Sequence, residues 1–125
     1  MNATGRVRFV DHKGRRILLT DLSDLTPDDA PAVLDDAKKL VATLPKERTL
    51  LSLLVVQRMK FDPQTIDAMK KVGRDNEPWV IATAVVGLSA IGRVVARVVS
   101  TFSGRRYASF DTVEQAKEWL VRQQA

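Results

Sequence analysis

Residues 50–56 read LLSLLVV, and this run decides the fold because apolar side chains fill six of its seven positions. A strand with one face in solvent alternates apolar and polar residues, so a continuous apolar run predicts a strand buried on both faces. Residues 79–86, WVIATAVV, have the same character and are rich in β-branched side chains. The two runs predict adjacent central strands of a parallel sheet that carries helices on both sides.

Two weaker strand patterns flank this centre. Residues 6–10 alternate in polarity, residues 11–14 (DHKG) supply turn residues, and the apolar run resumes at 17–19. This succession predicts a β-hairpin near the N-terminus. Residues 106–110 predict a short edge strand near the C-terminus.

Two helices are predicted before the second buried strand. The first begins at Thr26-Pro27, where a capping hydroxyl precedes a proline at the first helical position, and it ends before Pro45. The second begins at Asp62-Pro63, and Gly73 is its expected end. Each carries an apolar stripe at helical spacing.

Two further helices are predicted after the second buried strand. Ser89 is a candidate N-cap for a helix over residues 88–102, and residues 111–114 (DTVE) open the last helix. Strands and helices then alternate along most of the chain without a linker or a repeat. We expect a single α/β domain with a mixed, mostly parallel sheet of about five strands and about four helices.

The stretch VVGLSAIGRV, residues 85–94, has glycines at the spacing of a phosphate-binding loop. Such a loop needs a lysine for the phosphates and a serine or threonine for magnesium, but an arginine and a valine follow Gly92. The dinucleotide fingerprint fails as well, because Ser89 stands where its second glycine belongs. We therefore expect a strand-to-helix turn that binds neither ATP nor GTP, with weak anion binding at Gly87 and Ser89 as the alternative.

Composition argues against most enzymatic chemistry. The chain has no cysteine and a single histidine, His12. A thiol nucleophile, a cysteine metal site and a multi-histidine metal site are therefore ruled out. His12 falls in the predicted hairpin turn, where we expect a solvated ring, and no serine lies in a nucleophile elbow. The sequence predicts a protein that is not an enzyme and that has no metal or other cofactor.

The net charge of +5 and the pI near 9.9 raise the question of nucleic-acid binding. Residues 21–36 are acidic, whereas basic residues crowd the N-terminus, namely Arg6, Arg8, Lys13, Arg15 and Arg16. No nucleic-acid motif is present and aromatic residues are sparse. We expect solvated arginines, with nucleic-acid binding through a basic surface as a weaker alternative.

A membrane span is not expected, although residues 79–102 are largely apolar. Arg93 and Arg97 interrupt the stretch, and each arginine at mid-membrane costs about 2.5–3.5 kcal/mol on insertion scales. The N-terminus, MNATGRVRFV, lacks the apolar core of a signal peptide. The expected location is the cytoplasm.

The element order, the strand LLSLLVVQ with its proline-capped helix, and the tail VVGLSAIGRVVARVVSTFSGRRYASFDTVEQAKEWL resemble STAS-like proteins. More narrowly they resemble the bacterial SpoIIAA-like group, also described as STAS/SEC14-like. The resemblance implies a non-catalytic regulatory or ligand-binding module. Members that antagonise anti-sigma factors carry a phospho-acceptor in an Asp-x-Ser-Gly motif between a central strand and the next helix.

The matching stretch here, residues 57–63 (QRMKFDP), contains no serine. Thr65 falls inside the following helix, where its hydroxyl can serve local backbone bonding, and Asp62 is expected to be the helix cap. We therefore expect no phosphorylation switch at this loop.

The helix predicted over residues 88–102 is apolar over more of its surface than one sheet can cover. Exposed apolar patches of this kind mark interaction surfaces, and two-fold association is the commonest arrangement of soluble oligomers. We expect a homodimer or another protein partner on this helix. The alternative is a small apolar or anionic ligand in a cleft, as the SEC14-like label implies. The candidate interface consists of Leu88, Ile91, Arg93, Val94, Val95, Arg97, Val98 and Val99.

Overall fold

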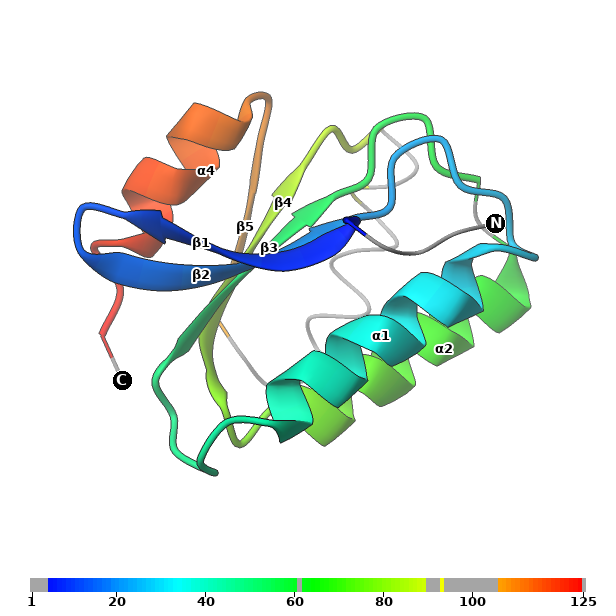
Figure 1. The fold of residues 1–125 in the computed structure, drawn as a ribbon. Helices are drawn as coiled ribbons and strands as arrows, with labels where there is room; N and C mark the ends of the chain where they lie inside the picture. The colour runs from blue at the N-terminus through cyan, green and yellow to red at the C-terminus, as the bar shows by residue number, and fades with distance from the viewer. Residues whose placement is uncertain (1–4, 61, 90–92, 94–105, 125) are drawn as a thin grey trace.

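The structure is a computed structural model, and it describes residues 5–60, 62–89, 93 and 106–124. The described elements alternate between strands and helices after an N-terminal hairpin (Figure 1). In chain order they are β1 (Val7–His12), β2 (Arg15–Asp21), α1 (Ala30–Ala42), β3 (Leu50–Val55), α2 (Pro63–Asn76), β4 (Val80–Val86), β5 (Arg106–Phe110) and α4 (Val113–Leu120).

The sheet has five strands in the order β1-β2-β3-β4-β5. The β1–β2 pair is antiparallel, and the other three pairs are parallel. All seven residues of β4 are buried, and β3 is buried over its first four residues. The prediction that the two apolar runs are adjacent, non-edge, parallel strands of a mixed sheet is confirmed.

Helices cover both faces of this sheet, as the apolar runs require (Figure 1). On one face, Ala116 and Leu120 of α4 pack into a core cluster with Ile17, Leu51 and Leu53. On the opposite face, α1 packs against the sheet, and α2 lies beside α1, against which it makes most of its contacts. The sheet is therefore the middle of three layers.

The β1–β2 hairpin closes through Lys13 and Gly14, whose φ angles are 50° and 79°. Positive φ at both positions of a two-residue loop is the geometry of the type I′ turn, whose twist matches that of paired strands. His12 pairs with Arg15 as the last residue of β1. The prediction of a hairpin is confirmed, but His12 belongs to the strand and not to the turn.

The predicted start of the first helix is wrong by one turn. Helix α1 begins at Ala30, with Asp29 as its N-cap and a proline in its first turn. That proline is Pro31, which has no backbone N–H to donate to the carbonyl of Pro27. A helix begun at Pro27 would carry Pro31 in its interior, whereas a start at Ala30 places it where the N–H is not needed.

The predicted stop of the second helix at Gly73 is also wrong, because α2 continues to Asn76. A glycine within a helix costs about 1 kcal/mol relative to alanine. Contacts beyond it oppose this cost: Asn76 is buried, and the Asp75 carboxylate lies 2.8 Å from the Lys38 ammonium of α1. The predicted N-terminus at Asp62-Pro63 is confirmed.

Most of the helix predicted over residues 88–102 lies outside the described residues. Within the described part, Arg93 is helical and its N–H donates to the carbonyl of Ser89 at 2.9 Å. This is the i→i−4 bond that the carbonyl of an N-cap residue accepts.

Gly87 joins β4 to that segment and is tightly packed. Its φ is +89°, and a Cβ built on it would lie 2.1 Å from Cγ and 3.0 Å from Cα of Gln57, in the loop after β3. Gly14 also has a positive φ, +79°, but a Cβ there would meet nothing within 4 Å. The glycine after β4 is therefore required by sterics as well as by backbone conformation.

We predict that Gly87→Ala destabilises the protein more than Gly14→Ala. The left-handed conformation costs alanine about 1 kcal/mol at either site, and overpacking against Gln57 adds roughly 1–3 kcal/mol at Gly87 alone. Urea unfolding of the two variants measures the difference. Equal losses of unfolding free energy would contradict the packing argument.

Candidate functional site

The loops that follow β2 and β3 meet at the carboxyl edge of the parallel sheet. Backbone bonds continue the ladder beyond the strands: Leu22 N–H donates to Val55 O at 2.7 Å, and Asp24 N–H to Gln57 O at 2.9 Å. Lys60 N–H donates back to the carbonyl of the first loop at 3.0 Å. In open α/β sheets ligands bind outside this edge, so it is the first place to look for a site.

Asp24 and Arg58 lock these two loops together. Arg58 donates from Nε at 2.6 Å and from Nη2 at 3.0 Å to the two carboxylate oxygens of Asp24. Both residues have left-handed backbones, with φ of 62° and 57°, a conformation that non-glycine residues hold only when their surroundings impose it. The hydrogen bond from Arg58 lowers the pKa of Asp24. Sequence reasoning missed this pair, because no local pattern links the two loops.

Part of the predicted weak anion site at Gly87 and Ser89 is already hydrogen-bonded within the protein. The N–H of Gly87 donates to Phe110 O at 3.2 Å, so it is not free for an anion. The exposed Ser89 and Arg93 lie on the other side of the turn, and the Arg93 guanidinium is 3.8 Å from the Asp111 carboxylate. An incoming anion would compete with that carboxylate, and anion binding here stays a prediction.

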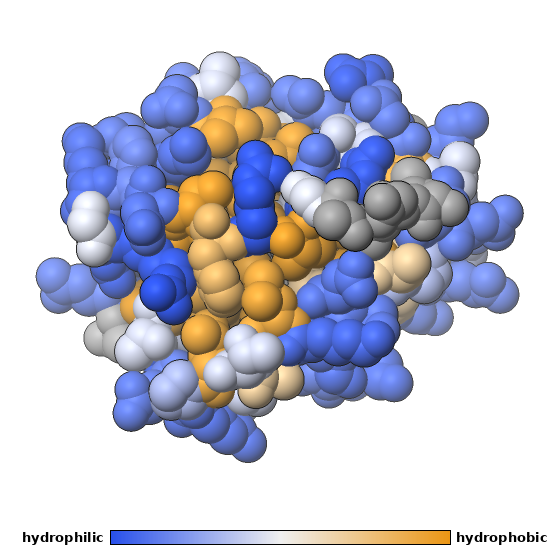
Figure 2. Space-filling model, in the orientation of Figure 1, coloured by the Kyte–Doolittle hydropathy of each residue, from blue (hydrophilic) through white to orange (hydrophobic). Residues whose placement is uncertain are grey.

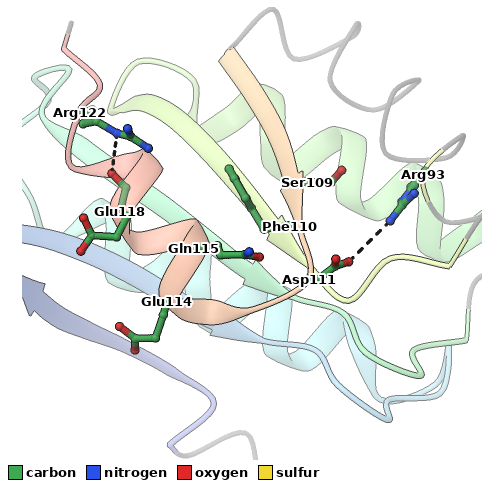
Figure 3. Close-up of a pocket in the computed structure, with 8 residues that line it drawn as sticks. All are labelled: Arg93, Ser109, Phe110, Asp111, Glu114, Gln115, Glu118 and Arg122. Carbon is green, nitrogen blue, oxygen red and sulfur yellow. Dashed lines mark hydrogen bonds and ion pairs between the residues drawn. The ribbon is translucent and has the colours of Figure 1, made fainter.

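A surface pocket of about 680 Å³ opens beside this turn (Figure 3). Its walls come from β5 and α4, with Arg93 on one side and Arg122 on the other. The lining consists of Arg93, Ser109, Phe110, Asp111, Glu114, Gln115, Glu118 and Arg122. Seven of these eight side chains are polar, and the ring of Phe110 is tilted by 49° against that of Trp119, with centroids 5.7 Å apart. Polar groups and apolar side-chain carbons therefore both line the pocket.

Two of the eight predicted interface residues, Leu88 and Arg93, lie in the described part of the chain. Leu88 is half-buried and packs on the α1/α2 side of the sheet, in one cluster with Met69, Val72 and Tyr107. Arg93 is exposed. The other six predicted residues, Ile91, Val94, Val95, Arg97, Val98 and Val99, fall outside the described residues.

The expectation of a solvated histidine is wrong. The His12 side chain is only 18% exposed, and its Nε2 lies 2.8 Å from Oε1 of Glu118 on α4. Lys13 donates to the other carboxylate oxygen of Glu118 at 2.7 Å. The hydrogen bonds from Lys13 and then from His12 lower the pKa of Glu118. The hairpin turn is thereby tied to the last helix, across 106 residues of sequence.

The N-terminal basic residues are not simply solvated either. Arg6 donates to the carbonyls of Asp21 and Ser23 at 3.2 and 3.0 Å, and Arg15 donates to Val121 O at 3.0 Å. Arg16 lies over the ring of Phe9 at 5.1 Å. Arg6 and Arg15 thus attach the hairpin to the loop after β2 and to the C-terminal segment, which leaves fewer cations for phosphate contacts.

Asp62 is the N-cap of α2, as the sequence predicts, and it is bonded to Thr65. The Asp62 carboxylate accepts from the Thr65 N–H at 2.7 Å and from its hydroxyl at 2.6 Å, and both bonds lower the pKa of Asp62. Thr65 is 2% exposed. The hydroxyl bonds the cap side chain and not the backbone, which differs from the local backbone bonding expected.

Two properties of the described residues concern metals and membranes. No group of three or more histidine, cysteine, aspartate or glutamate side chains there could hold a metal ion. None of the helices in that part of the chain is long and apolar enough to cross a membrane.

Comparison with known proteins identifies the fold. No model of a known protein family matches the chain, and no curated protein matches it. A solved structure does match, that of an uncharacterised protein of the DUF3478 family with a SpoIIAA-like fold from Shewanella loihica PV-4. It is similar at a TM-score of 0.71 and 15% identity over 91% of each chain. The chain therefore has a SpoIIAA-like fold, as its sequence predicted, and an identity this low establishes the fold alone.

We predict that Glu118→Gln weakens the pH dependence of stability. Because the pKa of Glu118 is lowered on folding, its stabilisation is present above the unfolded pKa, about 4.3, and is lost as pH falls through the folded value. Urea unfolding from pH 6 to 3 should show the native protein and the variant converging in acid. Glu114→Gln, on the same helix and 76% exposed, is the control. A constant difference across the range would contradict the assignment.

We also predict that Thr65 is not a regulatory phosphosite. A kinase would have to expose a buried hydroxyl and break its hydrogen bond to the Asp62 carboxylate. Phosphopeptide mass spectrometry of protein purified from its native cells should find no phosphate at Thr65. Phosphate found there, together with altered partner binding, would refute the prediction.

Proposed function

We propose that this protein is a non-catalytic interaction module that self-associates through residues 88–102. The observation that carries the proposal is the apolar surface around Leu88, just after the end of β4. Leu88 shares a cluster with Met69 and Val72, and all three remain half-buried. The fully buried residues of α2 are Thr65 and Asn76, so its apolar side chains stay at an incompletely covered surface.

This surface supports an interface because Leu88 begins residues 88–102, whose sequence has more apolar side chains than one sheet face can cover. The residues after Leu88 are apolar at more positions than one sheet face can use, and the neighbouring helix offers half-buried apolar side chains. Incompletely covered apolar area of this kind is the usual mark of protein–protein contact. The SpoIIAA-like fold is compatible with a regulatory role of this type.

The two alternatives have weaker support. An apolar ligand of the SEC14-like kind needs an apolar cavity, whereas the pocket beside α4 is lined by charged and amide side chains. Nucleic-acid binding needs free cations, and several N-terminal arginines are engaged with carbonyls of the chain itself.

Sedimentation of the purified protein tests the proposal. The native protein should show twice the 13.9 kDa of one chain, and Val94→Asp or Val98→Asp should return it to one chain. A charge buried in an interface without a partner is strongly unfavourable. Ala32→Asp, at an exposed position of α1, is the matched control and should remain dimeric. A native mass of one chain at high concentration would remove self-association.

A further inference from the structure

Within the described part of the chain, a row of backbone groups on the outer edge of β1 has no hydrogen-bond partner. Asp21 N–H donates to Arg6 O at 2.7 Å, which makes residues 6 and 21 a hydrogen-bonded pair. Such pairs alternate along an antiparallel ladder, and the register places Arg8, Val10 and His12 in the same phase. The N–H and C=O groups of Val7, Phe9 and Asp11 therefore point away from β2.

Two of the features that protect sheet edges, a proline and a bulge, are absent from β1. Strand β1 is at the end of the sheet order, it contains no proline, and its pairing with β2 runs without a bulge over all six residues. No described strand or helix pairs with its outer side. The outward N–H and C=O groups of Val7, Phe9 and Asp11 provide enough hydrogen bonds for one added strand.

The side chains along this edge favour a particular kind of strand. Val7, Phe9 and Val10 are half-buried, and Figure 2 shows apolar surface gathered over the face where β1 and β2 lie in Figure 1. Arg8 is exposed on the α4 side of this edge, where its Nη1 also donates to Gly5 O at 2.7 Å, and the exposed Arg16 lies over Phe9 on the α1 side. The edge is thus apolar at its centre and mainly cationic around it.

We infer that β1 binds an extended, acidic segment of a partner protein as a sixth strand. The segment places an acidic residue opposite Arg8 and apolar residues opposite Phe9 and Val10, because residues directly opposite each other share a face of the sheet. A second copy fits less well, since it would bring the same arginines together. This surface is separate from residues 88–102, so its failure would leave the proposed self-association standing.

The backbone part of the inference is tested by Asp11→Pro against Asp11→Ala. Both remove the same exposed carboxylate, but only proline removes the outward N–H, and neither disturbs a β1–β2 hydrogen bond. The probe is a short fluorescein-labelled peptide with two central valines followed by a glutamate, flanked by threonines. Fluorescence anisotropy should show roughly threefold to tenfold weaker binding to Asp11→Pro than to Asp11→Ala, as expected for one lost hydrogen bond. Equal affinities, or no binding to the native protein, would overturn the inference.

The charge part is tested by Arg8→Glu, which does not depend on how well the proline variant folds. This variant should lose its preference for the glutamate peptide and should prefer a peptide with lysine at that position. An unchanged preference would overturn the acidic assignment. If the native protein forms dimers that Asp11→Pro dissociates and Val94→Asp does not, a second copy occupies the edge and the inference is wrong.

Discussion

Burial of the β3–β4 pair on both faces is the constraint on which the rest of the structure depends. Every side chain of β4 is buried, so each face of the sheet needs a helical layer. Burying a large aliphatic side chain contributes about 1.5–3 kcal/mol, which makes this the main source of stability at the centre of the sheet. The connection after β3 must cross over the sheet, because β3 and β4 are parallel neighbours.

The polar contacts act on a different part of the structure. The hydrophobic core packs the layers together, whereas directional polar contacts join the hairpin turn to the C-terminal helix. His12 and Lys13 hold Glu118, and Arg15 holds the carbonyl of Val121, so the hairpin fixes the end of α4. Part of the positive charge that suggests a nucleic-acid partner therefore serves to join the hairpin to the C-terminal segment of the same chain. Composition alone could not separate these two uses.

The sequence predicted the strands with two-sided burial and the Asp62 cap, but it started the first helix one turn too early and missed the contacts between distant residues. The strand runs and the Asp62 cap are local signals, and the structure confirms them. Pro31 was a local signal too, and it outweighs the capping pattern at Thr26 because a proline in a helix interior costs about 3 kcal/mol.

The candidate site was less predictable than the fold. The contact between His12 and Glu118 joins positions 106 residues apart, and the Asp24–Arg58 pair joins two loops whose proximity exists only after β2 and β3 have paired. Neither contact leaves a periodic or motif-like trace in the sequence. A site made of such contacts follows from the topology, so it can be located only when the sheet order is known.

The carboxyl-edge loops show how the fold and the expected absence of a phosphorylation switch are related. A switch at this edge needs a loop that can change its backbone when a phosphate arrives. Here the loop after β3 carries no serine, its Gln57 is packed against Gly87, and Arg58 clamps Asp24 from a left-handed backbone. Each contact constrains the same few residues, and movement of one would break the others. The contacts that fix this loop therefore oppose the backbone change that a phosphorylation switch requires.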